Sequence, residues 1–530
     1  MRIQIQKAAA LLLALLQALS MTACGGAKAD EPKADDTDTT VEENNSQPEE
    51  EPAAERHPDS LTLAVASEPT SLNPYNHASV VSGYMNQMTY NKLFRLDIDT
   101  LEPVPELCES YENIDELTWR FKIYEGVYFH DGVEMTAEDV KASMEYARTF
   151  TESSRTTGFW ESIEIVDPYT VEIRTNSPHA LILNDLANGN TIVPKHLIDE
   201  GNDFNQNPIG SGPYKYVEWV LGDCVRFVRN DNYWDEAHQP QIAEITWRAI
   251  PEGTSRTIAL EAGEVDVVID VDTNDIDRLE ADEEIEVLSK AGTRMTFFGM
   301  NNEAAPFDNE NFRKAVTAAI DREAVMMVAV NGQGIVSESL NPAVFQGSSQ
   351  EGVIHYDVEQ ARKYLDESGI DPTTVTFTCM TYTDETRRTA EVIQAYLQEI
   401  GITMEIESLD FAAWLERLLS GDFETSVGGY TASDLLTYMK GLWHSSSIGA
   451  SNLVRLRDPE IDGLIDQAMT QLDPEERTAT LEEISRKIND KALFVSLYTT
   501  TVVRAYDADL QGMRVSASGG ILYQDLRWAE

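Results

Sequence analysis

The feature that most restricts the fold is the alternation of strand-like and helix-like segments along the chain, which begins after the first 60 residues. Residues 61–66 mix alternation with β-branched side chains, and residues 117–123 alternate strictly between apolar and polar side chains, as half-buried strands do. Thr136 stands three residues before Asp139 and ahead of Val140, an order typical of a capped amphipathic helix. Strand-like and helix-like segments continue to alternate to the C-terminus, and this alternation predicts a mixed α/β fold.

Length and charge restrict the possible functions. The 530 residues are enough for roughly two to four domains, and 42% hydrophobic residues are enough for large cores. Lys and Arg number 40 against 92 Asp and Glu, a formal net charge of −52. Because such a chain repels polyanions, nucleic acid is excluded as a partner.

Motifs of catalysis and metal binding are absent from the sequence. The eight histidines form no HxH or HExxH pattern, and there is no GxSxG, no phosphate-binding GxxxxGK[ST] and no CxxC. A triad assembled from distant residues stays open, but we expect no enzyme activity, no cofactor and no metal site.

The N-terminus has the pattern of an export signal. Arg2 and Lys7 precede residues 8–19, which are apolar apart from one Gln, and Thr22, Ala23 and Cys24 follow. This end resembles the lipobox of bacterial lipoproteins, which implies a signal peptide at residues 1–24 and lipidation of Cys24. The alternative is a soluble secreted protein in which the cysteine stands there by chance.

Residues 25–60 predict a disordered acidic linker. Within residues 27–60, twelve Asp or Glu stand against three Lys or Arg, and there is no Phe, Tyr or Trp. Such a segment cannot bury a core, and its like charges extend it, so we interpret it as a spacer between a membrane and the folded body. An acidic binding tail is the alternative.

The order of motifs from residue 61 to the end resembles solute-binding protein family 5, the extracellular peptide- and nickel-binding components of ABC importers. The pieces that carry the resemblance, in family order, are Glu68-Pro69 with Ser71-Leu72-Asn73-Pro74, Pro103 to Ser110, Phe129-His130-Asp131-Gly132 with Thr136 to Val140, Gly210-Ser211-Gly212-Pro213-Tyr214, Tyr233-Trp234, Gly263-Glu264-Val265-Asp266, Pro306-Phe307-Asp308, Arg313-Lys314-Ala315 and Ile320-Asp321-Arg322.

The resemblance implies the type II fold of periplasmic binding proteins, with two lobes around a cleft and an additional domain. The implied parts are lobe I from residues 61–92, 206–292 and 498–530, additional domain II from 93–205, and lobe III from 293–497. Closure of the lobes around a solute would precede docking on an ABC permease and its ATPase. The implied location is extracytoplasmic, with a monomer anchored to the membrane by lipid.

The resemblance also implies residues that contact the solute. Peptide-binding members pair the α-ammonium of the peptide with an acidic residue that follows an aromatic strand, and here Asp434 follows Tyr430. An N-cap of the helix predicted for residues 435–443 is an equally good interpretation of Asp434, and both roles can coexist. The other candidates for the cleft are the aromatic residues Trp160, Tyr382 and Trp443.

We therefore expect a binding protein for oligopeptides or dipeptides. One alternative is a non-peptide solute, such as a nickel chelate, haem or a glutathione-like molecule. A surface lipoprotein enzyme or an adhesin is the alternative from another class, and neighbouring permease and ATPase genes would support import instead.

Overall fold

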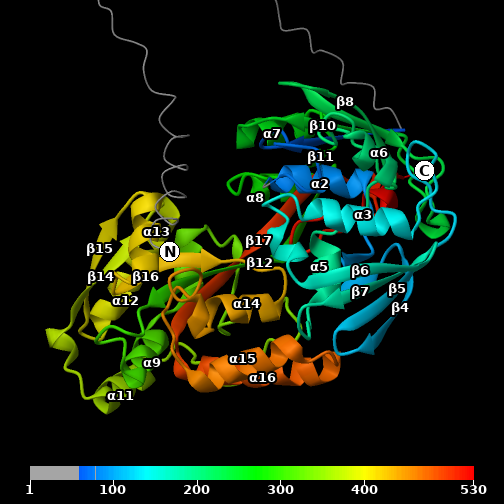
Figure 1. Cartoon of the computed structure of the whole chain (residues 1–530). Coiled ribbons are helices and arrows are strands. Elements are labelled where there is room, and N and C mark those ends of the chain that lie inside the picture. Colours follow the sequence, from blue (N-terminus) through cyan, green and yellow to red (C-terminus); the bar gives the residue numbers. More distant parts are fainter. Residues whose placement is uncertain (1–58, 78, 530) are drawn as a thin grey trace, which may run out of the picture. The chain divides into compact units, whose positions relative to one another are not determined.

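The computed structural model describes residues 59–77 and 79–529. The predicted signal peptide, Cys24 and the linker up to residue 58 lie outside the described residues. Strands and helices follow one another along the whole of the described chain (Figure 1), so the predicted mixed α/β class is confirmed.

The main sheet of the described residues has 11 strands. Their order is β15 (Thr403–Ser408), β14 (Thr376–Thr381), β16 (Thr425–Tyr430), β12 (Ile285–Met300), β17 (Phe494–Asp507), β11 (Val267–Val268), β1 (Ser60–Val65), β10 (Glu244–Ala249), β9 (Cys224–Arg229) and β8 (Tyr214–Val220), with β13 (Gly334–Val336) paired to β17. We call β15, β14 and β16 the β14 half of the sheet, and β11, β1, β10, β9 and β8 the β1 half.

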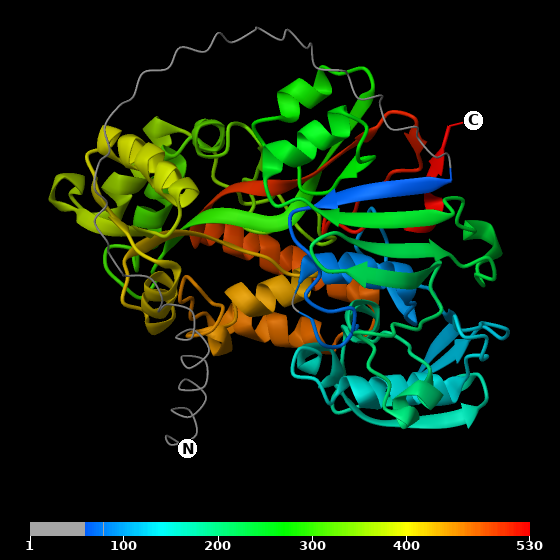
Figure 2. The same ribbon diagram turned by 90° about the horizontal axis from the view of Figure 1, so that it is seen from above.

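Strands β12 and β17 join the two halves. They form an antiparallel ladder that pairs residues 285–291 with 501–507 and residues 295–299 with 494–499. Between Ala291 and Met295 the register shifts. On one side of this shift β17 pairs with β11, and on the other side β12 pairs with β16. Figure 2 shows the two strands, green and red, running together between the halves.

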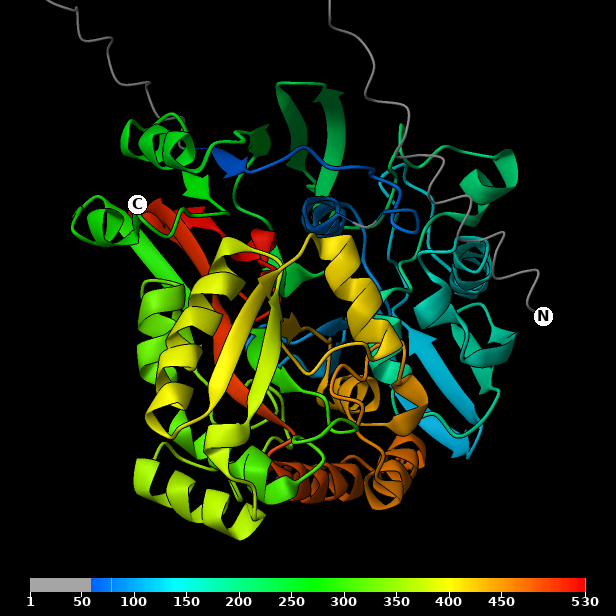
Figure 3. The ribbon, with the colours of Figure 1, turned by 90° about the vertical axis from the view of Figure 1, so that its left-hand side faces the viewer.

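The helices of the described residues lie around both halves of the sheet, and Figure 3 shows the β14 half in yellow with helices beside it. The helices that follow strands of the β1 half along the chain are α2 (Val80–Thr89), α7 (Gly253–Glu261) and α8 (Ile276–Glu280). The helices that lie between β12 and β17 along the chain, in the same part as the β14 half, are α9 (Glu310–Ala319), α10 (Arg322–Ala329), α11 (Val358–Ser368), α12 (Asp384–Glu399), α13 (Phe411–Ser420), α14 (Leu435–Leu442), α15 (Pro459–Thr470) and α16 (Pro474–Lys491).

A second sheet has the strand order β4 (Cys108–Asp115), β5 (Thr118–Ile123), β7 (Thr170–Thr175) and β6 (Trp160–Asp167). Its part of the chain also holds β2 (Phe94–Leu96), β3 (Pro103–Pro105), α3 (Ala137–Ala147), α4 (Ser154–Thr157), α5 (Ile182–Asn188) and α6 (Lys195–Glu200). Near the C-terminus β18 (Leu510–Gln511) pairs with β19 (Arg527–Trp528).

Local signals in the sequence located several elements correctly. The strands predicted at residues 61–66 and 117–123 are β1 and β5, which confirms both. Helix α3 begins after Thr136, whose backbone N–H donates to Asp139 Oδ2 at 2.8 Å, so the predicted cap is confirmed. Helix α14 begins after Asp434, as the alternative interpretation of that residue expected.

The buried apolar residues form several cores. One core combines β1 and β10 with the C-terminal residues Leu510 and Leu526. Another draws only on residues 93–192, around the second sheet, and the largest lies between residues 298 and 498. The exact limits of lobe I, domain II and lobe III stay a prediction, and β12 and β17 run through two of them.

Candidate functional site

A cavity of about 800 Å³ lies where the β12–β17 ladder shifts register. We call it the hinge cavity. Gly292 to Arg294 of β12 and Thr500 to Arg504 of β17 line it. Asp270 lines it from the β1 half, and Arg388 of α12 lines it from the β14 half. The cavity is therefore bounded by both halves of the sheet and by the strands that join them.

Two glycines make room at this point. A side-chain Cβ on Gly292 would lie 2.8 Å from the carbonyl oxygen of Thr500, too close for any residue but glycine without a shift of the backbone. On the neighbouring strand, a Cβ on Gly429 would lie 2.8 Å from the guanidinium carbon of Arg294. The glycines thus let β17 approach β12 and let the Arg294 side chain lie over β16.

The charged side chains of the hinge cavity differ in how they are held. Arg388 donates to the carbonyl oxygen of Ala329 at 2.9 Å, and Glu385 accepts from the Tyr498 hydroxyl at 2.8 Å. Asp270 accepts from a backbone N–H at 3.0 Å. Arg294 is half-buried, and no hydrogen bond or ion pair ties it to another described residue. The cavity therefore offers groups of both signs, with a free guanidinium among them.

Arg504 also lines the hinge cavity, and its hydrogen bonds hold neighbouring elements together. Its guanidinium is buried and donates to the carbonyl oxygens of Ile269 at 2.7 Å and Gly519 at 2.8 Å, and to the Tyr84 hydroxyl at 3.1 Å. Burial raises the pKa of Tyr84, and the charge of Arg504 partly offsets this rise. Arg504 therefore ties β17 to α2 and to the C-terminal loop.

Backbone donors lie free at the edge of the hinge cavity. Thr431, Ala432 and Ser433 follow the end of β16 and line the cavity. Their N–H groups donate no hydrogen bond to any other described residue. A short segment outside the strand, with unpaired backbone donors, therefore lines the cavity.

Asp434 stands next to this segment and caps α14. Its Oδ1 accepts from the Thr437 backbone N–H at 2.8 Å, and its Oδ2 accepts from the hydroxyls of Thr437 at 2.8 Å and Ser433 at 2.9 Å. It lines a pocket of about 50 Å³ beside Arg477 and Glu102, rather than the hinge cavity. Burial lowers the pKa of Arg477, while the charges of Glu102 and Asp434 raise it.

The structure places Tyr430 and Tyr382 in different clusters. Tyr430 ends β16, is half-buried and meets Tyr438 edge to face at 5.4 Å between ring centroids. Tyr382 lies against Trp414 at 4.4 Å and against Phe411 at 5.3 Å. Neither tyrosine lines the hinge cavity, although Tyr430 directly precedes the segment that does.

Trp443 and Trp160 are core residues in this structure. Trp443 is fully buried, donates from Nε1 to Asn341 Oδ1 at 3.2 Å and lies 5.0 Å from the Phe494 ring. Trp160 is 4% exposed, and the guanidinium carbon of Arg148 lies 3.3 Å from its ring centroid. The structure does not bring either tryptophan to the hinge cavity. Contact of the five candidates with a solute stays a prediction.

Sequence reasoning missed the charged residues of the hinge cavity. No motif marks Asp270, Arg294 or Arg388, because they come from segments that only the fold brings together. One signal was present: Gly292 interrupts the otherwise strand-like residues 285–300, and a glycine inside a strand often marks a bulge or a close approach.

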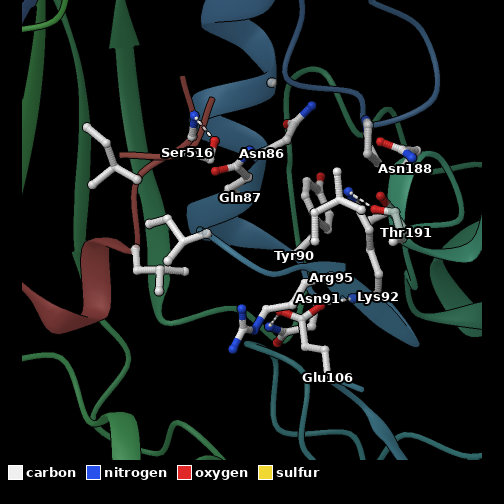
Figure 4. A pocket seen from close by; sticks show the side chains of 18 of the residues that line it. Asn86, Gln87, Tyr90, Asn91, Lys92, Arg95, Glu106, Asn188, Thr191 and Ser516 are labelled. Atoms are coloured by element: carbon white, nitrogen blue, oxygen red, sulfur yellow. Dashed lines mark hydrogen bonds between the residues drawn. The ribbon is translucent and has the colours of Figure 1, made fainter. Parts of the chain in front are cut away.

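A second pocket, of about 280 Å³, borders the hinge cavity, since Ser518 lines both. Figure 4 shows Asn86 and Gln87 of α2 near Ser516 at one end, and Arg95, Lys92 and Glu106 gathered at the other. We call it the α2 pocket.

Comparison with known proteins decides the family. Residues 102–450, more than half of the chain, match the model of bacterial extracellular solute-binding proteins, family 5 Middle. The chain therefore belongs to solute-binding protein family 5. Proteins of family 5 are non-catalytic transport components, and this family 5 protein is the extracellular solute-binding component of an ABC importer.

Individual relatives extend over nearly the whole described chain. The family 5 protein is 26% identical over 483 residues to the glutathione-binding protein GsiB of Salmonella paratyphi A, covering 88% of this chain and 94% of GsiB. HbpA2 of Haemophilus parasuis is 22% identical with a TM-score of 0.82, over 89% of this chain and 100% of HbpA2. The oligopeptide-binding protein AppA of Bacillus subtilis, solved with a nonapeptide, is 25% identical with a TM-score of 0.66, and the match covers 89% of this chain and 99% of AppA. Within residues 59–77 and 79–529, no helix has the length and apolar character needed to cross a bilayer.

Proposed function

We propose that this family 5 protein captures oligopeptides or dipeptides in the hinge cavity and delivers them to an ABC permease. The observation that carries the proposal is the segment Thr431–Ser433, which lines the cavity and whose N–H groups have no partner among the described residues. An extended peptide binds such an edge through main-chain hydrogen bonds, whatever its side chains are. The nonapeptide bound by the relative AppA supports the same substrate class.

The charges of the cavity suit a zwitterionic solute. Arg294 offers a guanidinium without a protein partner, which a carboxylate of the solute can accept from. Asp434 uses three acceptor positions within its own helix turn, and an ionised carboxylate has about four. One position therefore remains, and closure would have to bring the α-ammonium of a peptide bound along Thr431–Ser433 to Asp434, which lines the neighbouring small pocket in this structure, with Tyr430 beside it.

Capture requires closure of lobe I and lobe III about the hinge. The register shift between Ala291 and Met295 is the place where β12 and β17 are least tied together, so we assign the hinge to it. A solute that contacts both walls of the cavity binds the closed form more tightly and shifts the population toward it. Residues 93–205 form the additional domain II of this arrangement.

The location follows from the N-terminal signal. We propose that Cys24 is lipidated and becomes the first residue when the signal residues before it are removed, and that the acidic residues 25–60 act as the spacer to the membrane. The binding protein then stays next to its permease and ATPase as a lipid-anchored monomer outside the cytoplasm.

Glutathione is the second candidate, because the relative GsiB is named for binding it. Glutathione is a modified tripeptide, so the same donors and charges apply to it. Haem or a nickel chelate would need other contacts. In the part of the chain that the structure describes, no group of three His, Cys, Asp or Glu is placed to hold a metal ion.

Replacing Ala432 by Pro tests the proposal directly, because it removes one of the three free N–H groups. Ala432→Ser keeps the N–H and serves as the matched control. Losing one hydrogen bond to a peptide should weaken binding roughly three- to tenfold in calorimetric titration with tri-, tetra- and pentaalanine. Equal affinity of the Pro and Ser variants, at equal thermal stability, would show that main-chain pairing does not hold the solute.

A further inference from the structure

The α2 pocket contains an arginine, Arg95, whose charge lowers the pKa of Glu106 but whose guanidinium makes no hydrogen bond to another described residue. Arg95 follows the start of β2 and is half-buried; its backbone pairs with Val104 of β3, but its side chain has no hydrogen bond or ion pair with another described residue. Glu106, which lines the same pocket, accepts from Asn91 Nδ2 at 2.9 Å and from the Lys92 backbone N–H at 2.7 Å, and no ion pair joins it to Arg95. The guanidinium of Arg95 therefore keeps its donors free toward the pocket.

The other charges of the pocket are held in place by the protein. Lys92 Nζ donates to the carbonyl oxygen of Ala187 at 2.7 Å. Burial lowers the pKa of Lys92 and raises the pKa of Glu106, and each charge partly offsets the shift of the other. Burial also lowers the pKa of His77, so this side chain is neutral near pH 7. Arg95 is thus the cation at this end whose side chain makes no hydrogen bond to the protein, whereas Lys92 is tied to Ala187.

An unpaired donor lies at the other end of the pocket. Asn86 is 9% exposed, and its Nδ2 is buried without any acceptor among the described residues. A buried amide that makes no hydrogen bond destabilises the protein, so its presence calls for a partner from outside the chain. Figure 4 shows Asn86 near Ser516, on the side of the pocket where Ser518 leads to the hinge cavity.

Part of the pocket wall is apolar. Ile521 and Leu522 of the C-terminal loop, with Leu96 and Ile98, line the pocket. Such a wall suits the methylene groups of an acidic side chain, while its two ends supply the polar contacts. The pocket thus has an unpaired amide donor at one end and the Arg95 guanidinium at the other.

We propose that the α2 pocket is a subsite for an acidic side chain of the bound solute. The chain of the solute leaves the hinge cavity past Ser518, Asn86 donates to one of its carbonyl oxygens, and Arg95 binds its carboxylate. Arginine suits this role because its planar guanidinium donates two parallel hydrogen bonds to a carboxylate. The inference rests on the proposed function, and it assigns a preference for solutes that carry a glutamate or aspartate side chain.

The test compares the peptides Ala-Glu-Ala and Ala-Gln-Ala by calorimetric titration. Wild-type protein should bind the Glu peptide about ten- to a hundredfold more tightly, the range for a hydrogen bond to a charged group. Arg95→Gln should remove this preference and leave the affinity for the Gln peptide unchanged. Arg95→Lys should restore part of it, and Arg362→Gln on exposed α11 should bind as the wild type does.

Asn86→Leu separates a binding role from a structural one. Because it removes a buried donor without a partner, it should raise the melting temperature of the empty protein and weaken binding of both peptides. A lower melting temperature with unchanged affinities would overturn the role assigned to Asn86. Equal affinity of the wild type for both peptides, or a preference that survives in Arg95→Gln, would overturn the subsite while peptide capture stands.

If neither peptide binds, the proposed peptide capture is wrong, and carboxylate binding by the α2 pocket is then tested independently of peptides. Crystals of the wild type and of Arg95→Gln are then soaked in 4-bromobenzoate, and the bromine is located by its anomalous signal. A peak beside Arg95 that is lost in the variant supports a carboxylate subsite. A wild-type pocket without a peak would overturn it.

Discussion

Replacing Asp434 by Asn tests whether its carboxylate serves helix α14 alone or also binds the ammonium group of a peptide. Asn is as good an N-cap as Asp, and its carbonyl oxygen can still accept from the Thr437 backbone N–H. The amide nitrogen replaces Oδ2, and the hydroxyls of Thr437 and Ser433 can turn to accept from it. We therefore expect the empty variant to lose less than about 1 kcal/mol of unfolding free energy.

The effect on binding should be far larger. In the closed cleft the Asp434 carboxylate would pair with the α-ammonium away from water, and removing one partner of such a pair costs about 2–4 kcal/mol. This corresponds to roughly 30- to 700-fold weaker binding. Asp434→Ala should add a cap defect of about 0.5–2 kcal/mol, so it would mix the two effects.

Calorimetric titration with one peptide and its N-acetylated form is the assay, and thermal unfolding of the empty proteins is the control. Acetylation removes the ammonium charge, so it should weaken binding to the wild type as strongly as Asp434→Asn does. It should change little in the variant. A wild-type protein that binds both forms equally would refute the ammonium contact, and Asp434 would then be a helix cap only.

Three further expectations follow from the sequence and the structure. Cys24→Ala should abolish labelling of the protein by a radioactive fatty acid, and undiminished labelling would show that the lipobox interpretation is wrong. Burial lowers the pKa of His130 to about 4, while its Nε2–H donates to the Gly212 carbonyl oxygen at 2.9 Å. Its contribution to stability is therefore present above its unfolded pKa near 6.5 and is lost as the pH falls toward about 4, up to about 3 kcal/mol, so His130→Gln should flatten this part of the pH profile of chemical denaturation. A profile of the same slope in the variant would argue against this. Gly292→Ala should force β12 from β17 and weaken peptide binding, whereas Gly463→Ala, with open space around its Cβ, should bind normally; equal affinities would contradict the hinge assignment.

The sequence located those elements whose signals are local. Thr136 and Asp139 mark the start of α3 by chemistry that acts over a single turn, and the face of α12 around Ile393 and Leu397 repeats with the helical period. Strand β5 was visible because its burial alternates residue by residue. Such patterns depend on neighbours in the chain, so they can be recognised without the fold.

The site was harder to predict because its groups come from distant segments. The β12–β17 ladder joins residues about two hundred positions apart, and no local pattern announces that pairing. An aromatic side chain serves equally well in a core or in a binding wall, so the sequence does not distinguish these two roles for Trp443 and Trp160, and the structure buries both. Arg95 and Asn86 carry no motif, and only the lack of a protein partner, which requires coordinates, distinguishes them.

Native mass spectrometry tests the central claim most directly. The protein is stripped of any ligand by unfolding and refolding, then offered an equal mixture of tri- to pentapeptides, glutathione, haem and a nickel–histidine chelate. We expect adducts with the masses of peptides, one per protein, and their loss in Ala432→Pro but not in Ala432→Ser. Adducts with haem or the nickel chelate, or no peptide adduct at all, would contradict the claim that the hinge cavity captures peptides.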